Sequence, residues 1–407
     1  MAAVALLTAC NGGSGGRKHG KSPAGSNAPT DSVAAVSYVT PAAVNVYIEN
    51  SGSMDGYVKG VTEFEQAVYN YLSDIKISAI TDTLNLYYIN SQVIPQGSDI
   101  GDFIEKLEPS NFRAKGGNRG TSDIANVLET VLKETKAGKV AILVTDGIFS
   151  PGKGKDAEQY LVNQQIGIKR LFADYLKTNK TAAVMVYQLQ SKFSGTYYNN
   201  VDASIPLNEN RPFYIWVIGD VKHLCNLRGQ IADDKLKARS AAQNLNIFTT
   251  MNGCQTVKYA INPSIGKFKK SKTDNKTIAN LKKDSRTGKV KFAVNVDFSG
   301  MLLDESYLLD PNNYENSSKY DLEIKKSATT GGGYTHVLYF TSDRVYAGAI
   351  TVKLKADMPA WVEAANDDAG TTAVKNKTYG IKYQLGGVYD AFTFTNRYYT
   401  EIKINVN

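Results

Sequence analysis

The first half of the chain alternates short apolar runs with stretches in which apolar residues recur at helical spacing. Continuous runs rich in Val, Ile, Leu and Tyr predict strands that are covered on both faces; they span residues 44–48, 84–89, 140–144, 182–189 and 213–218. Apolar residues three and four apart predict helices; they lie at residues 64–75, 124–132, 168–176 and 221–242. Strands that alternate with helices predict an α/β fold, with a mainly parallel sheet flanked by helices.

The second half, from residue 251 to residue 407, follows a different pattern. Short alternating segments predict strands at residues 257–261, 290–298, 320–325, 335–341, 347–354 and 401–406. Turn-forming segments rich in Asp, Pro, Gly and Asn separate them. The pattern predicts an antiparallel, β-sandwich-like domain with one short helix near residues 383–389. We see no catalytic group of residues there, so a spacer or packing role is favoured.

The first 41 residues differ from both halves. Residues 1–10 are apolar and end in Leu7-Thr8-Ala9-Cys10, which resembles the lipobox of bacterial lipoproteins, where the cysteine is lipidated. Residues 11–41 are rich in Gly, Ser, Ala, Asn and Pro and cannot bury a core. We therefore expect a signal-sequence remnant and a flexible tether before an α/β domain at residues 42–250. The resemblance implies a bacterial cell-envelope protein whose lipid anchor at Cys10 attaches it to a membrane.

Three polar loops lie beside the predicted strands and helices of the α/β half. They span residues 49–56, 116–122 and 145–148. In sheets of this class, ligands bind beyond the carboxyl ends of the strands. We therefore expect the three loops to form one site at that edge of the sheet.

The amino-acid sequences of these loops resemble motifs of a known family. Glu49-Asn50-Ser51-Gly52-Ser53-Met54 follows a strand, Gly120-Thr121-Ser122-Asp123-Ile124 precedes a helix, and Val144-Thr145-Asp146-Gly147 ends a strand. In this order they resemble the metal-ion-dependent adhesion site of von Willebrand factor A domains, written D-x-S-x-S, then Thr, then Asp. The resemblance covers roughly residues 42–250 and implies a Rossmann-like domain.

The resemblance also implies a divalent cation and a partner protein. The implied ligands are Glu49, Ser51, Ser53, Thr121 and Asp146. Their hydroxyl and carboxylate oxygens suit hard cations, so we expect Mg²⁺, or else Mn²⁺ or Ca²⁺. In the family, an open position on the metal accepts a carboxylate from a partner protein, so we expect a partner that offers an acidic side chain.

One residue departs from the family pattern. The family has Asp where this chain has Glu49, whose carboxylate lies one methylene further from the backbone. Glu49 could bind the metal directly, distort the site or abolish it. If the site is lost, the hydroxyls of the three loops serve only to cap helices or satisfy turn N–H groups. The neighbouring acids Asp55 and Asp123 are expected to be solvated or capping rather than ligating.

Composition and charge narrow the choice of partners. The chain has 407 residues, of which 42% are hydrophobic and 21% charged, which is enough for two globular domains. The net charge is +8, with the densest basic run at Lys267, Lys269, Lys270 and Lys272. We interpret this run as a solvated basic loop, and we expect no nucleic-acid binding because no recognisable nucleic-acid module accompanies it.

Two segments leave alternatives open. Cys225 and Cys254 flank the predicted domain junction, and they could pair in an oxidising compartment or remain two buried thiols. Residues 190–211 join two predicted strands and are long and polar, so they form either a recognition insertion or a simple surface hairpin.

The sequence thus favours a binding protein over an enzyme. His19, His223 and His336 lie far apart in sequence and away from the three loops. A metal-assisted hydrolase would depend on Glu49 alone as its general base, so we rank it last. We expect an envelope lipoprotein that binds a protein partner through a divalent cation. The main alternative is a structural scaffold with a degenerate site.

Overall fold

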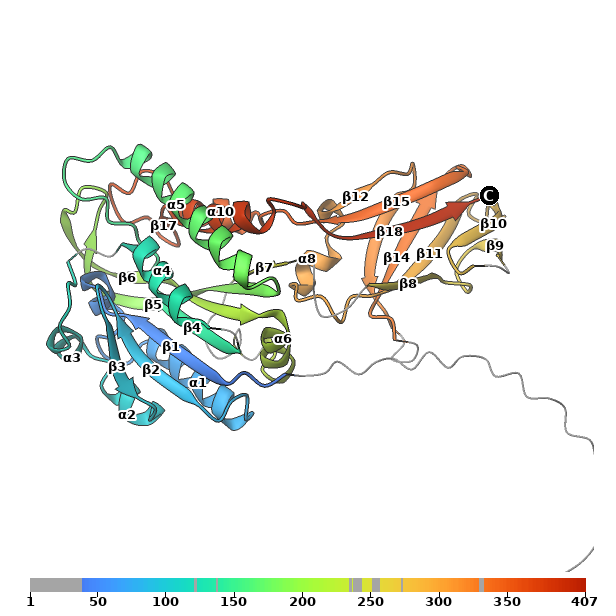
Figure 1. Cartoon of the computed structure of the whole chain (residues 1–407). Coiled ribbons are helices and arrows are strands. Elements are labelled where there is room, and N and C mark those ends of the chain that lie inside the picture. The colour runs from blue at the N-terminus through green and yellow to red at the C-terminus, as the bar shows by residue number, and fades with distance from the viewer. Residues whose placement is uncertain are drawn as a thin grey trace, which may run out of the picture. The chain divides into compact units, whose positions relative to one another are not determined.

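The computed structural model describes most of the chain after the N-terminal segment (Figure 1). The described residues are 39–120, 123–136, 138–233, 236, 244–250, 257–271, 274–328 and 333–407. They belong to the compact unit Val36–Asn407. The predicted signal remnant, the lipidation of Cys10 and nearly all of the predicted tether lie outside the described residues.

A seven-stranded sheet forms the centre of the first half. Its order is β3-β2-β1-β4-β6-β5-β7. The strands are β1 (Ala43–Glu49), β2 (Leu84–Ile89), β3 (Val93–Gly97), β4 (Lys139–Thr145), β5 (Ala182–Tyr198), β6 (Ser204–Asp220) and β7 (Asn244–Thr249). β1 pairs in parallel with β2 and β4, and the other neighbouring strands pair antiparallel. Every residue of β1 is buried, as its apolar run predicts.

Helices cover both faces of this sheet (Figure 1). The helices are α1 (Glu63–Ile77), α2 (Ile100–Glu105), α3 (Pro109–Ala114), α4 (Ile124–Glu134), α5 (Ala157–Thr178) and α6 (Val221–Gln230). Side chains of α1, α2, α3 and α6 share a core with Val46 of β1, whereas those of α4 and α5 share one with Tyr47. Neighbouring residues of β1 thus face opposite layers, as strand geometry requires. The predicted α/β fold with flanking helices is confirmed.

The strands predicted at residues 182–189 and 213–218 are not parallel neighbours of β4. They belong to β5 and β6, which form one long hairpin paired from Ala182 with Asp220 to Tyr198 with Ser204. Parallel neighbours need a crossover of a dozen residues or more, usually helical, and the chain has no helix between these two strands. Residues 190–211 therefore form a hairpin, whether or not it serves recognition, and β6 separates β4 from β5.

The described residues of the second half contain two larger sheets, besides one two-stranded pair (Figure 1). One has the order β12-β15-β18-β10-β9 and the other β13-β14-β11-β8. The strands are β8 (Lys258–Ile261), β9 (Lys267–Lys270), β10 (Thr277–Lys282), β11 (Val290–Asp297), β12 (Tyr314–Asn316), β13 (Asp321–Lys326), β14 (His336–Ser342), β15 (Gly348–Lys355) and β18 (Tyr398–Val406). All pairs are antiparallel except a short β10–β18 contact. Phe292 and Phe340 of one sheet and Ile350 and Ile402 of the other share one core, so the predicted antiparallel strands are confirmed.

One segment of the second half packs on the α/β sheet. It contains α9 (Trp361–Ala364), β16 (Asn366–Asp367), β17 (Thr378–Tyr379) and α10 (Ile381–Phe392), and α10 matches the short helix predicted near residues 383–389. Leu385 of α10 shares a core with Phe172 of α5 and Trp216 of β6. A Cβ at Gly387 would lie 2.7 Å from the Gln165 carbonyl oxygen, so glycine permits this close helix contact. The predicted boundary between residues 250 and 251 stays a prediction.

Two further observations concern membrane-spanning helices and the cysteines. Among the described residues, no helix combines the length and the apolar character needed to cross a bilayer. Cys225 of α6 is disulfide-bonded, so the alternative of a free thiol at this position is wrong. The other two cysteines, Cys10 and Cys254, lie outside the described residues.

Candidate functional site

The candidate site lies where β1 and β4 end. Glu49 is the last residue of β1, and Asp146 directly follows the last residue of β4. The two strands are parallel neighbours, with Ile48 opposite Val144, so both acids lie at the same edge of the sheet. The prediction that these two loops meet at the carboxyl ends of the strands is confirmed.

The first loop leaves β1 through a tight 3₁₀ turn, η1 (Gly52–Gly56). The Met54 N–H donates to the Ser51 carbonyl at 3.2 Å, and the Ser51 and Ser53 hydroxyl oxygens lie 3.0 Å apart. A Cβ at Gly56 would lie 2.3 Å from the ring of Phe193, so only glycine lets the turn pass beneath β5. The turn therefore brings both hydroxyls together at the edge where Glu49 lies.

Arg119 fastens this loop to the second one. Its guanidinium donates to the Asn50 carbonyl at 2.7 Å and to the Ser51 carbonyl at 3.2 Å, and it forms an ion pair with Asp55. Arg113 approaches the other oxygen of Asp55 at 3.3 Å. The expectation that Asp55 is solvated or capping is therefore wrong, because two arginines hold it.

The second loop is described only in part. Thr121, one of the implied ligands, and Ser122 lie outside the described residues. Asp123 accepts hydrogen bonds from the N–H groups of Ala125 and Asn126 at 3.1 and 3.3 Å, and it caps α4. The prediction that Asp123 is a capping residue is confirmed.

The two carboxylates of the site are buried. Glu49 and Asp146 are each 1% exposed. The Thr145 hydroxyl donates to Glu49, and the Ile148 N–H donates to Oδ1 of Asp146 at 3.1 Å. Oδ2 of Asp146 has no hydrogen-bond partner. Burial first, and then the negative charge of Glu49, raise the pKa of Asp146 to about 7, against the lowering effect of nearby donors.

Arg211 was not predicted as part of the site. It is 2% exposed, and its guanidinium carbon lies 4.9 Å from the ring centroid of Tyr197. One nitrogen donates to the Val374 carbonyl at 3.2 Å. Its positive charge lowers the pKa of Asp146 and partly offsets the two acids. The sequence feature that could have indicated Arg211 is a single arginine next to a continuous apolar strand.

The loop after β4 is braced by the C-terminal segment. Gln384 of α10 is fully buried, and its amide donates to the Gly147 carbonyl. The Tyr214 hydroxyl donates to the Thr378 hydroxyl at 3.0 Å. Gln384 also was not predicted, because it lies more than two hundred residues from the loop it holds. Its signal was a lone amide within an apolar helix.

The assembled site is enclosed and offers only oxygen atoms. Ser51 is 3% and Ser53 9% exposed, and the Tyr198 hydroxyl lies close to Gly52. Among the described residues, no three or more His, Cys, Asp or Glu side chains could together hold a metal ion. A cation here would therefore rely on hydroxyls together with Glu49 and Asp146. Such a donor set fits Mg²⁺ or Ca²⁺.

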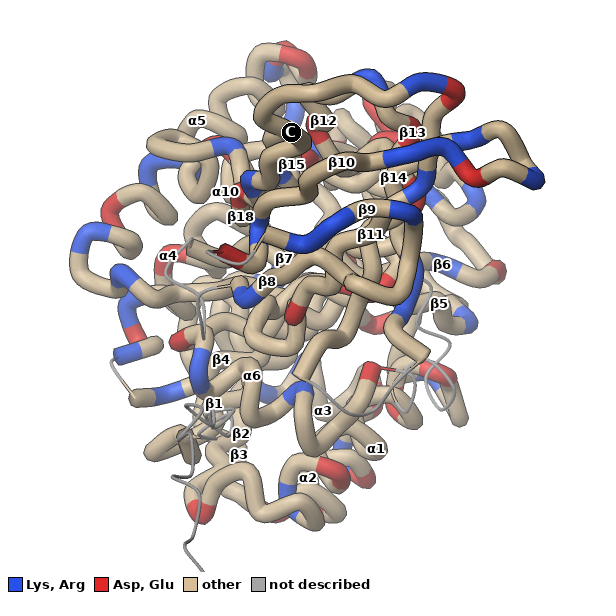
Figure 2. Tube along the Cα trace, turned by 90° about the vertical axis from the view of Figure 1, so that its right-hand side faces the viewer, with Lys and Arg blue, Asp and Glu red and all other residues tan. Residues whose placement is uncertain are grey.

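The predicted basic run lies elsewhere, on the sheets of the second half. Lys267, Lys269 and Lys270 are exposed on β9, which is an edge strand, whereas Lys272 lies outside the described residues. Figure 2 shows further Lys and Arg residues along β10 and its neighbours. The run is solvated as predicted, but it forms a strand rather than a loop. Charged side chains on an edge strand oppose pairing with other chains.

Comparison with known proteins adds no family to this picture. Neither the protein-family models nor the curated proteins searched give a match for this chain.

Proposed function

We propose that the chain is a cell-envelope lipoprotein that holds a divalent cation at the ends of β1 and β4. A protein partner would add an acidic side chain to that cation. The main observation in favour of a bound cation is that Oδ2 of Asp146 is buried without a hydrogen-bond partner, beside the buried carboxylate of Glu49. A buried carboxylate oxygen without a partner is unfavourable, and a bound cation would remove that penalty.

Glu49 fits the role of an adapted ligand. The Thr145 hydroxyl donates to its carboxylate, and the Gly147 N–H donates to the Thr145 oxygen at 2.9 Å. This chain of hydrogen bonds orients the longer side chain and links it to the Asp146 loop. We expect Glu49→Asp to weaken cation binding, because the shorter side chain loses the Thr145 contact. Tighter binding by this variant would indicate a degenerate site.

The proposals of a protein partner and of a lipid anchor are based on the sequence. The three loop motifs favour a partner carboxylate as an additional ligand, and the segment ending in Cys10 favours a lipid anchor. Incorporation of a labelled fatty acid into the expressed chain, and its loss in Cys10→Ala, tests the anchor.

A structural scaffold is the second candidate, and one observation favours it. The four described ligand residues are at most 9% exposed, so a partner's side chain cannot reach the cation without movement of the loops or hairpin. In this alternative the cation, if bound, would only stabilise the fold. A metal-assisted hydrolase stays the least favoured reading, since neither His223 nor His336 belongs to the three loops.

Thermal unfolding of the full chain in EDTA, and then with millimolar Mg²⁺, Mn²⁺ or Ca²⁺, tests the cation. A cation at about 100 times its dissociation constant adds roughly 2.7 kcal/mol, which is a measurable rise in the unfolding temperature. Asp146→Asn should lose this rise, and Asp174→Asn, at an exposed acid on α5, should keep it. No rise with any of the three metals would contradict the proposal.

A pull-down from envelope extracts, with and without EDTA, separates the two candidates. Proteins retained only with the metal, and lost with Asp146→Asn, support cation-mediated partner binding. A metal-dependent unfolding temperature without any metal-dependent partner supports the scaffold.

A further inference from the structure

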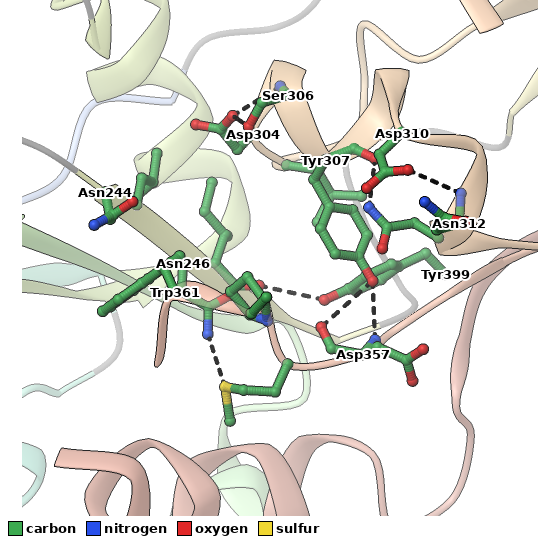
Figure 3. Close-up of a pocket in the computed structure, with 17 residues that line it drawn as sticks. Asn244, Asn246, Asp304, Ser306, Tyr307, Asp310, Asn312, Asp357, Trp361 and Tyr399 are labelled. Carbon is green, nitrogen blue, oxygen red and sulfur yellow. Dashed lines mark hydrogen bonds between the residues drawn. The ribbon is translucent and has the colours of Figure 1, made fainter. Parts of the chain in front are cut away.

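A cavity of about 600 Å³ lies beside β7, away from the candidate cation site. Its walls come from β7, from helix α8 (Glu305–Leu309) and the 3₁₀ turn η2 (Pro311–Asn313), from residues 357–361, and from β18. Figure 3 shows Asn244, Asn246 and Trp361 on the side of β7, opposite Tyr307 and Asn312. Its volume falls in the range typical of small-molecule sites.

Aromatic rings form part of the walls, and their hydroxyls are already used. The Tyr307 hydroxyl donates to the Lys355 carbonyl and accepts from the Asp357 N–H, both at 2.9 Å. The Tyr399 hydroxyl donates to the Ile247 carbonyl at 3.3 Å. The two rings meet edge to face, with centroids 6.3 Å apart. These bonds fix the rings, so a ligand would meet their apolar surfaces rather than their hydroxyls.

The charge of the described lining residues disfavours anionic ligands. None of the described residues lining the cavity is Lys, Arg or His, whereas Asp304, Asp310 and Asp357 are all present. A phosphate or carboxylate group would enter without a cationic partner, beside three like charges. Nucleotides, acidic peptides and sugar acids are therefore poor candidates.

The same aspartates are poor ligands for a cation, because each is already engaged. Asp304 accepts from the Ser306 N–H at 2.8 Å, and Asp310 accepts from the Asn312 N–H at 2.9 Å. Asp357 forms an ion pair with Lys355 at 2.9 Å. Carboxylates that cap helices or pair with lysine attract a further positive charge less strongly than free ones.

The remaining polar groups suit hydroxyls. Asn246 is buried in the wall, and its amide nitrogen has only the weak acceptor sulfur of Met358, at 3.5 Å. The buried indole N–H of Trp361 has no hydrogen-bond partner. Asn244 and Asn312 add further amides to the lining. An amide offers donors and an acceptor together, as a hydroxyl requires, and the indole adds a donor.

We propose that this cavity binds a neutral saccharide of one or two sugar units. The amides and the Trp361 N–H would bond its hydroxyls, while the fixed rings of Tyr307 and Tyr399 and the indole of Trp361 would cover its apolar C–H faces. The inference is independent of the proposed cation site.

Ligand-observed NMR with the full chain tests this proposal. The neutral probes are glucose, galactose, mannose, N-acetylglucosamine, maltose, cellobiose and lactose, each at millimolar concentration. Glucose 6-phosphate, glucuronate and glucosamine serve as charged counterparts of matched size. We expect at least one neutral probe to bind, and its charged counterparts to bind more weakly.

Two variants locate the binding. Asn246→Ala removes an amide, and Trp361→Phe removes the indole N–H but keeps an aromatic ring; each should weaken binding about tenfold. Asn163→Ala, at an exposed position of α5, is the matched control and should leave binding unchanged. If Asn246→Ala lowers the unfolding temperature markedly, the partly exposed Trp361→Phe decides alone.

Three results would overturn the proposal. The first is the absence of binding by every neutral probe. The second is binding of a charged counterpart as tight as that of the neutral sugar. The third is binding that well-folded Asn246→Ala and Trp361→Phe both leave unchanged.

Discussion

Two acidic regions of this protein differ in the burial of their carboxylates and in the partners that these carboxylates have. At the ends of β1 and β4, Glu49 and Asp146 are buried, and one oxygen of Asp146 has no partner. Beside β7, Asp310 and Asp357 are exposed and each has a donor or a lysine. The first arrangement is unfavourable without an added positive charge, whereas the second is complete as it stands. Burial and pairing, rather than the number of acids, therefore indicate where a cation is needed.

The largest expected effect is that of Arg211→Ala. The substitution removes a buried positive charge that interacts with the buried Asp146 carboxylate, so the free energy of unfolding should fall by roughly 3 to 5 kcal/mol. Chemical denaturation in EDTA measures the change. Adding Asp146→Asn should recover part of the loss, because the two charges interact. Equal losses in both backgrounds would show that Arg211 acts through packing alone.

A pH series sharpens the comparison further. The folded-state pKa of Asp146 is raised to about 7, from the ordinary value of 3.8. The folded state therefore binds this proton more tightly than the unfolded state, and stability falls as pH rises from about 4 to about 7. In EDTA the expected contribution is roughly 2 to 4 kcal/mol. Asp146→Asn should flatten this part of the profile, and an unchanged profile would contradict the assignment.

Gln384→Ala should have a smaller effect on the same site. It removes the amide that donates to the Gly147 carbonyl, so we expect a loss of about 1 to 2 kcal/mol. Cation affinity, followed by the metal-dependent rise in unfolding temperature, should also fall because the Asp146 loop loses its brace. An unchanged affinity would show that the loop keeps its position without α10.

The smallest effect belongs to the region beside β7. Lys355 and Asp357 form a partly exposed ion pair, and their side chains are 32% and 46% exposed. Lys355→Ala should therefore change the free energy of unfolding by less than about 1 kcal/mol, with little dependence on pH. Denaturation measured beside Arg211→Ala gives the comparison directly. A loss as large as that of Arg211→Ala would break the distinction between the two regions.

Local patterns predicted much of this molecule. The apolar run of β1, the helical spacing in α1 and α4, and the alternating strands of the second half all form the expected elements, because each pattern reports which residues are buried. Glu49 and Asp146 also lie at one edge of the sheet as predicted, since parallel neighbours end there.

Long-range partners were not predicted, for a physical reason. An apolar run indicates a strand but not its neighbour, so the position of β6 between β4 and β5 could not be inferred. Arg211 and Gln384 interact with residues far away in sequence, and no local period reports such contacts. Whether a partner can reach the site also depends on such long-range contacts, because the β5–β6 hairpin covers the loops.

The position of α10 has a consequence for how the protein is made. Its residues, 381–392, share a core layer with α4 and α5, which are synthesised more than two hundred residues earlier. A nascent chain on the ribosome therefore cannot close that layer until α10 has been synthesised. The apolar surfaces of α4 and α5 therefore wait for their late partner while the intervening residues are made, which lengthens the time in which they are exposed.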